Sequence, residues 1–481
     1  MYREFRQEAT EAALATAPSR LRMLVAIASY GSKNLALLHE MIRRLREFEM
    51  HVDIVVLSNE PKALGPGVEV VVGLPSPNPW SLPFAHKALF AQRAADYDLF
   101  LYTEDDIGIT QAHVEAFLRV SPELADDEIA GFMRYEIDPA GTRYLLDVHG
   151  RFHWKPESAR RRGDFVVAEY TNEHAAMYLL TRRQLEHALV SGGFLRPPCE
   201  DQHDMLCTAA TDPYTVCGFR KVLCISQLDD FLVHHMSNRY AGRWGLTRAE
   251  VGEQLRTQIE IAAGRHPAST LCPTETRLMH GEWSKSYHEL PSDELLALVP
   301  GHARSVLSIG CGWGAAERRL QARGASLTVV PLDSVVGADA HRAGMEVVYG
   351  TLDECRVALG GRRFDALLMT NLLHLLPDPA QAVAAWAPLV APDGVFVLSG
   401  PNLGALRVRA KEMLGRGGYR KLRAYGASGM HRLAPAAVEH HLAAAGLRRC
   451  ARHWIASAGA GRLESRLGPL CAASWAIQAR H

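Results

Sequence analysis

The apolar residues near the start of the chain fall into short runs separated by one stretch with helical spacing. Residues 21–29 and 52–57 are mostly apolar and are predicted to be buried strands. Over residues 35–48, apolar positions recur every three or four residues, which predicts an amphipathic helix. Residues 68–72 add another apolar run. A strand, a helix and a strand in this order form the βαβ unit of a parallel sheet, so we predict an α/β fold.

Three acidic residues follow the next apolar run directly. The run Leu99–Thr103 leads into Glu104, Asp105 and Asp106. Adjacent like charges repel one another, and a hard divalent cation with oxygen ligands relieves that repulsion. Ligands of open α/β sheets bind at the carboxyl ends of strands, so the sequence favours a cation that holds a diphosphate here. The alternative is an acidic turn before a helix that starts near Gln111.

The second half of the chain carries a glycine turn between a predicted strand and a predicted helix. Residues 305–309 are an apolar run, residues 310–314 read Gly-Cys-Gly-Trp-Gly, and residues 315–321 begin a helical pattern. The next predicted strand, 327–332, ends at Asp333. Glycines let the backbone approach a ligand, and an acidic residue about 20 positions later accepts hydrogen bonds from a ribose diol. The turn therefore predicts a nucleoside-containing cofactor, either a dinucleotide or S-adenosylmethionine.

Length and composition indicate more than one domain. A chain of 481 residues is too long for a single hydrophobic core. The formal net charge of zero gives no basis for nucleic-acid binding, and no apolar run is long enough to span a bilayer. Charged residues at positions 3, 4 and 6 do not fit the apolar core of a secretory signal, so we expect a cytoplasmic protein. The nine cysteines lack a Cys-x-x-Cys pair and are interpreted as reduced packing residues.

The hydrophobic pattern loosens between residues 241 and 291, where prolines and mixed polar positions occur. This composition is typical of a linker packed between domains. We predict an N-terminal α/β domain over residues 1–265, a linker over 266–285 and a C-terminal α/β domain over 286–481.

Three motifs follow the βαβ start of the first half: Thr103–Asp106, Cys199–Asp204 and Val233–Met236. Together they resemble the GT-A class of nucleotide-sugar glycosyltransferases over approximately residues 20–245. The resemblance implies a GT-A-like, Rossmann-like domain in which Mn²⁺ or Mg²⁺ neutralises charge on the departing nucleoside diphosphate. The metal ligands that it implies are Glu104, Asp105 and Asp106, with His234 or His235.

Neighbouring side chains on a strand point to opposite faces, so only one of the two histidines is expected to reach the metal. A histidine pair after an apolar strand also fits a hydrogen-bond network at the surface. An inverting glycosyltransferase needs a carboxylate that takes the proton of the acceptor hydroxyl. Asp201 is the preferred candidate, and the others are Glu200 and Asp204. The alternative places these acids at a helix N-terminus without a catalytic part.

Three segments follow the glycine turn: residues 364–371 (FDALLMTN), 372–379 (LLHLLPDP) and 391–398 (APDGVFVL). With the turn, they resemble class I S-adenosylmethionine-dependent methyltransferases, especially the small-molecule branch that includes ubiquinone-biosynthesis enzymes, over approximately residues 285–481. A dinucleotide is disfavoured because the third glycine of Gly-x-Gly-x-x-Gly is missing. The expected fold of this half is a Rossmann-like domain.

The methyltransferase resemblance implies which residues face each part of the cofactor. These are Gly310, Gly312 and Gly314 for the methionine and ribose part, Asp333 for the ribose hydroxyls, the backbone at Thr351 and Leu352 for the adenine, and Asn371 near the methyl group. The sulfonium activates the methyl group itself, so the protein aligns the acceptor and, for a hydroxyl, removes its proton. His374 and His431 are candidates for that base, and the alternative for both is a structural role that closes the pocket.

The sequence therefore predicts a bifunctional enzyme of polysaccharide or glycoconjugate biosynthesis. Its partners are a nucleotide-sugar donor and a glycan or lipid-linked glycan acceptor. A basic segment over residues 403–425, with Glu412 as its single acid, fits an anionic acceptor or contact with an anionic membrane surface, although a solvated basic helix explains it as well. The alternative function keeps the methyltransferase and makes the first half an inactive glycan- or nucleotide-binding module.

Overall fold

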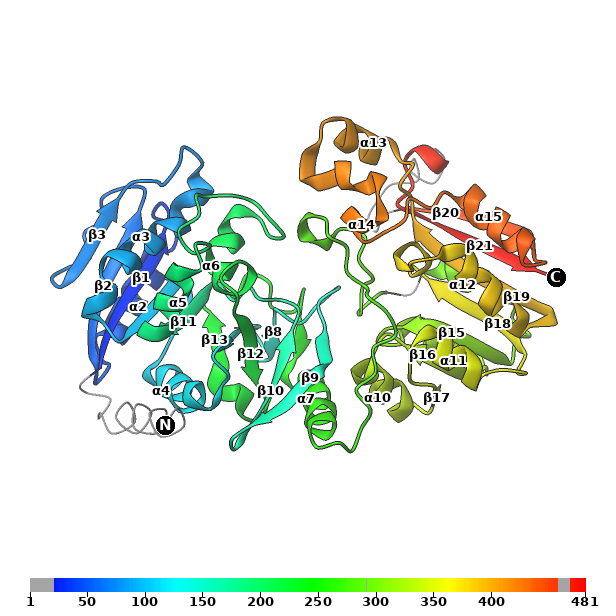
Figure 1. Cartoon of the computed structure of the whole chain (residues 1–481), viewed down its shortest axis with the longest axis horizontal. Helices are drawn as coiled ribbons and strands as arrows, with labels where there is room; N and C mark the ends of the chain where they lie inside the picture. The colour runs from blue at the N-terminus through cyan, green and yellow to red at the C-terminus, as the bar shows by residue number, and fades with distance from the viewer. Residues whose placement is uncertain (1–20, 291, 457–467) are drawn as a thin grey trace. The chain divides into compact units, whose positions relative to one another are not determined.

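The computed structural model describes residues 21–290, 292–456 and 468–481. The chain forms two compact units, of which the first ends at Ala263 and the second begins at Gly264 (Figure 1). The residues that the sequence predicts as a linker belong to the second unit. Leu271 and Leu278 are buried there, and Thr270 forms an isolated β-bridge with Asp333 of that unit.

The first unit is built around a five-stranded sheet in the order β11-β4-β1-β2-β3. The strands β4, β1, β2 and β3 run parallel, and β11 is antiparallel to β4. Nearly every residue of β1 is buried, which explains its continuous apolar run. The elements of this layer are β1 (Arg22–Ser29), α2 (Leu35–Leu45), β2 (His51–Ser58), β3 (Val68–Val72), α3 (Ala85–Gln92), β4 (Leu99–Glu104), β11 (Met177–Thr181) and α5 (Arg182–Val190).

Two smaller sheets complete the first unit, in the orders β14-β8-β7-β13-β5 and β6-β12-β10-β9. Because β4 ends at Glu104 and β5 begins at Ile107, the acidic triplet joins the main sheet to the first of these smaller sheets. The remaining elements are β5 (Ile107–Gly108), α4 (Gln111–Val120), β6 (Glu128–Ala130), β7 (Met133–Ile137), β8 (Arg143–Leu145), β9 (Trp154–Arg162), β10 (Phe165–Tyr170), α6 (Met205–Thr215), β12 (Arg220–Cys224), β13 (Leu232–His235), β14 (Leu246–Thr247) and α7 (Arg248–Ala262).

The second unit contains a seven-stranded sheet in the order β17-β16-β15-β18-β19-β21-β20, in which β21 runs antiparallel to both neighbours. Val306 and Leu307 of β15 belong to separate buried clusters, so both faces of the sheet are covered. Its elements are α8 (Asp293–Leu296), β15 (Ser305–Cys311), α9 (Ala315–Ala322), β16 (Ser326–Pro331), α10 (Ser334–Arg342), β17 (Glu346–Val347), α11 (Leu352–Ala358), β18 (Phe364–Thr370), α12 (Pro379–Trp386), β19 (Val390–Pro401), α13 (Leu406–Met413), η9 (Arg416–Arg423), α14 (Tyr425–Ser428), α15 (Pro435–Ala444), β20 (Arg448–Ile455) and β21 (Ser474–Arg480). Within the described ranges, every helix is too short or too polar to cross a membrane.

Candidate active sites

The acidic turn of the first unit is closed by a contact between Asp106 and His235. The antiparallel pairing of β5 with β13 sets His235 opposite Ile107 and places its Nε2 atom 3.1 Å from Oδ2 of Asp106. The Nδ1 atom of His235 lies 2.5 Å from Oε1 of Glu136, so this imidazole stands between two carboxylates. Burial alone would lower the pKa of His235, but the Asp106 carboxylate outweighs burial and raises it. The two side chains therefore stabilise each other's charged forms.

His234 points away from this turn, as the alternation of side chains along a strand predicts. Its ring stacks on Tyr135 with centroids 5.0 Å apart, and its Nε2 atom lies 3.0 Å from Oδ1 of Asn238. Of the two candidate metal ligands, His235 lies at the acidic turn, and His234 belongs to a hydrogen-bonded surface network.

The other two carboxylates of the triplet face different partners. Asp105 accepts a hydrogen bond of 2.8 Å from Nδ2 of Asn34, and burial raises its pKa. The backbone N–H of Glu104 donates to the carbonyl of Ala176 at 3.1 Å. Burial, followed by the charge of Asp106, raises the pKa of the Glu104 carboxyl to about 7. Asp105 is therefore engaged by Asn34, whereas the Glu104 carboxyl lies close enough to Asp106 to respond to its charge.

Over residues 21–290, Asp106 and His235 lack further side-chain ligands that a metal ion would need. Within the part of the chain that the structure describes, no three His, Cys, Asp or Glu side chains are grouped so as to hold a metal ion. Mg²⁺ in nucleotide enzymes is held by one or two carboxylates, with phosphate and water supplying the other oxygens. Among the described residues, the Asp106–His235 pair therefore does not form a metal site by itself.

The predicted proton acceptors of the first unit lie in the loop before α6. Oδ2 of Asp201 is 3.1 Å from Nη1 of Arg196, and the Asp201 side chain is 57% exposed. Glu200 is exposed as well. Asp204 is the N-cap of α6, where its Oδ1 atom accepts a hydrogen bond of 2.9 Å from the N–H of Cys207. The helix-terminus alternative therefore holds for Asp204, whereas Glu200 and Asp201 precede the first turn.

The glycine turn of the second unit connects β15 to α9. Gly310 and Gly314 have φ values of +78° and +70°, which L-residues rarely adopt. A β-carbon at Gly310 would also lie 2.6 Å from Cδ2 of Leu372. Glycine is therefore required at both positions by the backbone itself.

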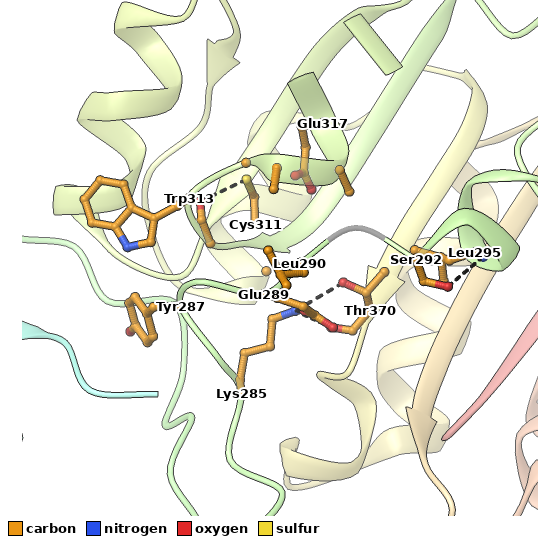
Figure 2. A pocket seen from close by; sticks show the side chains of 15 residues that line it. Lys285, Tyr287, Glu289, Leu290, Ser292, Leu295, Cys311, Trp313, Glu317 and Thr370 are labelled. Carbon is orange, nitrogen blue, oxygen red and sulfur yellow. Dashed lines mark hydrogen bonds and ion pairs between the residues drawn. The ribbon is translucent and has the colours of Figure 1, made fainter. Parts of the chain in front are cut away.

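Residues 283–290, which we name the strap, run across this turn (Figure 2). The N–H of Trp313 donates to the carbonyl of Tyr287 at 2.9 Å, and a β-carbon at Gly312 would lie 2.5 Å from that same oxygen. The sequence predicts ligand space above Gly312, and the structure places the backbone of Tyr287 there instead. Strap and turn enclose a cavity of about 40 Å³, lined among others by Lys285, Tyr287, Glu289, Gly310, Gly312, Gly314 and Thr370.

The residues predicted to hold ribose and adenine lie at helix N-termini, where two of them cap backbone N–H groups. Asp333 caps α10, because its Oδ1 atom accepts hydrogen bonds of 2.8 Å and 3.1 Å from the next helical N–H groups. Burial raises the pKa of the Tyr287 phenol, and the nearby Asp333 carboxylate adds to this. Thr351 caps α11 in a capping box with Glu354, and Leu352 is the first residue of that helix. These capping bonds explain Asp333 and Thr351 locally without a cofactor.

Residues 278–449 match the family model described as a methyltransferase domain. The second unit is a methyltransferase domain. Its glycine turn, the following acidic residue and the Rossmann-like sheet agree with the class I S-adenosylmethionine-dependent enzymes that the sequence resembles.

Similar proteins include ubiquinone biosynthesis O-methyltransferases of two bacteria. That of Stutzerimonas stutzeri is 30% identical over 115 residues, which is 23% of this chain and 48% of the relative. That of Azotobacter vinelandii is 30% identical over 139 residues, which is 26% of this chain and 60% of the relative. The chain thus spans about half the length of these curated relatives. A crystal structure of an S-adenosylmethionine-dependent methyltransferase from Archaeoglobus fulgidus is 15% identical, with a TM-score of 0.29, and the match covers 38% of this chain and 87% of that one.

Lys285 and Glu289 of the strap form an ion pair at the cavity of the methyltransferase domain. The buried ammonium of Lys285 also donates to the carbonyl and hydroxyl of Thr370, at 2.7 Å and 3.1 Å. Asn371, with φ of +46°, lies at the end of β18 and donates to Glu289. Lys285 and Glu289 are absent from the sequence prediction because only the fold brings them to the glycine turn. The sequence signal that could have indicated this ion pair is two opposite charges four residues apart in a non-helical segment.

His374 and His431 of the methyltransferase domain are not among the residues that line the cavity. Nε2 of His374 is 2.9 Å from the carbonyl of Trp283 in the strap, and its Nδ1 atom has no partner among the described residues. Burial lowers the pKa of His374 to about 4, so the imidazole is neutral near pH 7. Nε2 of His431 lies 2.9 Å from the carbonyl of Pro377. Both histidines therefore support the backbone around the pocket.

Proposed function

We propose that the methyltransferase domain transfers the methyl group of S-adenosylmethionine to an oxygen atom of an acceptor. The observation that carries this proposal is the ion pair of the buried Lys285 with the half-buried Glu289 beside the glycine turn, in a unit whose residues 278–449 match a methyltransferase family. The similar proteins named as O-methyltransferases support oxygen as the receiving atom.

The charged pair suits the amino-acid end of this cofactor. Lys285 would hold its carboxylate and Glu289 its ammonium, while the backbone at Gly310 to Gly314 lines the sulfonium side and Asp333 accepts from the ribose. Once bound, S-adenosylmethionine supplies an already activated methyl group. His374, with its low pKa and its contact to the strap, is a weak proton acceptor, so we assign it the positioning of the strap rather than the removal of the acceptor proton.

Calorimetric titration of S-adenosylmethionine into the full chain tests this proposal. We expect binding by the wild type and at least about tenfold weaker binding by Lys285→Met, because the carboxylate would lose its charged partner. Lys33→Met, which removes an exposed lysine of the first unit, is the matched control and should bind like the wild type. Absence of binding by the wild type would overturn the proposal.

The Asp106–His235 contact favours a second function, metal-dependent glycosyl transfer from a nucleotide sugar to a glycan or lipid-linked glycan. The pair would hold Mn²⁺ or Mg²⁺ together with the diphosphate, in polysaccharide or glycoconjugate biosynthesis. The full chain should then release nucleoside diphosphate from a sugar nucleotide only when Mn²⁺ or Mg²⁺ is present. His235→Ala should lose this release and His234→Ala should keep it. Binding of Mn²⁺ and UDP or GDP without turnover would support the inactive binding module instead.

Residues 406–423, which we name the basic cap, favour an anionic membrane surface as a partner. Leu406, Met413 and Leu414 are 55%, 83% and 65% exposed on this cap. Its single acid, Glu412, is already paired with Arg432. Exposed apolar side chains among cations suit contact with an anionic bilayer better than exposure to water alone. A lipid-linked acceptor would lie in such a bilayer.

A further inference from the structure

Four of the buried polar atoms in the first unit have no hydrogen-bond partner among the described residues. They are the hydroxyl of Tyr102, Oε2 of Glu173, Nδ1 of His174 and Nε2 of His203, and those of Glu173 and His203 face each other. An unsatisfied buried polar group is costly, so native proteins usually complete such groups with a ligand or water. The Glu173–His203 pair therefore marks a place where a polar ligand is expected.

Glu173 and His203 approach each other from different segments. Oε2 of Glu173 lies 3.5 Å from Nε2 of His203, which is longer than a normal hydrogen bond. The side chain of His203 is 7% exposed and that of Glu173 is 23% exposed. The carboxylate thus reaches solvent on one side while the imidazole closes the other side.

Glu173 is held beside the acidic triplet by its backbone. Lys221 donates to the carbonyl of Glu173 at 3.1 Å. Three residues further on, the carbonyl of Ala176 accepts from the N–H of Glu104. Ala176 has φ of +55°, a strained conformation for a residue with a β-carbon, and such strain gathers at functional sites. The segment that carries Glu173 is therefore fixed to the end of β4.

The backbone of His203 is also fixed by hydrogen bonds. Its carbonyl accepts hydrogen bonds from the N–H of Asp201 at 3.0 Å and from the hydroxyl of Thr208 at 3.1 Å. Asp201, in contrast, has its carboxylate at the surface in an ion pair with Arg196. Glu173, in contrast to Asp201, combines a fixed backbone with a carboxylate whose Oε2 atom makes only the long contact with His203.

We propose that Glu173 is the proton acceptor of the first unit and that His203 positions its carboxylate. This assignment rests on the proposed glycosyl transfer. In that reaction the acceptor O–H bond breaks and its proton passes to the carboxylate of Glu173. The acceptor oxygen forms a bond to the anomeric carbon, and the bond from that carbon to the phosphate oxygen breaks and releases the nucleoside diphosphate. Glu173 takes the role that the sequence predicts for Asp201 or Glu200.

The test uses the full chain with Mn²⁺ and UDP-glucose, UDP-galactose, UDP-N-acetylglucosamine or GDP-mannose, with water as the acceptor. Glu173→Gln should lower the rate of diphosphate release by about 10²- to 10⁴-fold and leave calorimetric binding of Mn²⁺ with UDP or GDP unchanged. Added formate should restore part of the rate to Glu173→Ala, which a purely structural role would not allow. Asp230→Asn, at an exposed side chain outside the proposed sites, is the matched control and should stay within about threefold of the wild type.

His203→Gln keeps a polar group beside Glu173 and should lower the rate less than Glu173→Gln does. The melting temperature of each variant checks that it is folded. If the wild type turns over a sugar nucleotide and Glu173→Gln does so equally well, the assignment of Glu173 is overturned and glycosyl transfer stands. Loss of rate in Asp201→Asn but not in Glu173→Gln would return the role to Asp201. If the wild type neither binds nor turns over any of these nucleotides, both proposals are overturned.

Discussion

The carbonyl oxygen of Tyr287 lies 2.5 Å from the position that a β-carbon would take at Gly312. Real β-carbons do not approach backbone oxygens so closely, so Gly312→Ala must push the strap away from the glycine turn. Lys285 and Glu289 move with the strap, and the proposed site for the methionine end is lost. We expect at least about tenfold weaker binding of S-adenosylmethionine, measured by calorimetry, because charge-assisted contacts would be broken.

Gly301→Ala is the control for this substitution, since a β-carbon at Gly301 meets no heavy atom within 4 Å. It should bind S-adenosylmethionine like the wild type. Equal affinities for Gly312→Ala and the wild type would mean that the strap does not take part in cofactor binding.

The basic cap should bind vesicles that contain phosphatidylglycerol and not vesicles of phosphatidylcholine alone, because its cations need an anionic surface. Replacing Leu406 and Met413 with serine should weaken vesicle co-sedimentation by about tenfold, since the two side chains together bury apolar area in the bilayer. Val190→Ser, at a position of the first unit that is 89% exposed, is the control and should leave binding unchanged. Identical binding to both vesicle types would rule out the membrane contact.

The sequence pattern is most informative where local chemistry decides the structure. The apolar runs at residues 21–29 and 52–57 become β1 and β2 because both faces of their sheet are buried. The glycines of residues 310–314 mark the turn correctly because the positive φ of Gly310 and Gly314 excludes other residues there. Alternation along β13 likewise predicts that His234 and His235 diverge.

Long-range contacts are what the pattern leaves open. His235 is separated from Asp106 by 129 positions, and the pairing of β13 with β5 decides which histidine meets the acid. The strap lies upstream of the glycine turn, so nothing in its own sequence indicates that Tyr287 covers Gly312. Glu173 escapes prediction for the same reason, because its significance comes from its approach to His203, which lies 30 positions further along the chain.

Asp212 lies fully buried between Lys87 and Arg196, and its carboxylate forms ion pairs with both cations. Asp212→Asn would leave the buried ammonium of Lys87 without its counter-charge, although burial already lowers the pKa of that lysine. We expect the free energy of unfolding of the first unit to fall by about 3–5 kcal/mol, measured by urea denaturation. Asp230→Asn, which breaks the exposed pair with Arg119, should cost less than about 1 kcal/mol. Equal costs would show that burial of the Asp212 pairs is unimportant.

Glu128 is the buried centre of an ion-pair network, with Oε1 lying 2.6 Å, 2.7 Å and 3.1 Å from guanidinium nitrogens of Arg160, Arg162 and Arg220. Burial alone would raise the pKa of this carboxyl, but the arginines outweigh burial and lower it from 4.5 to about 2. Because the folded-state pKa is the lower one, the contribution to stability is complete above pH 4.5 and is lost as the pH falls towards 2. The Glu128 carboxylate contributes about 3 kcal/mol to the free energy of unfolding above that window.

Glu128→Gln should therefore destabilise the first unit at pH 7 and flatten the dependence of its unfolding free energy on pH between 4.5 and about 2. Urea denaturation at a series of pH values measures both effects. Glu47→Gln, at a side chain that is 62% exposed, should keep the wild-type dependence. A pH dependence of Glu128→Gln that matches the wild type in this window would mean that other carboxylates govern the acid sensitivity. In that case the guanidinium groups of Arg160 and Arg162 would not stabilise the Glu128 anion more than water does in the unfolded chain.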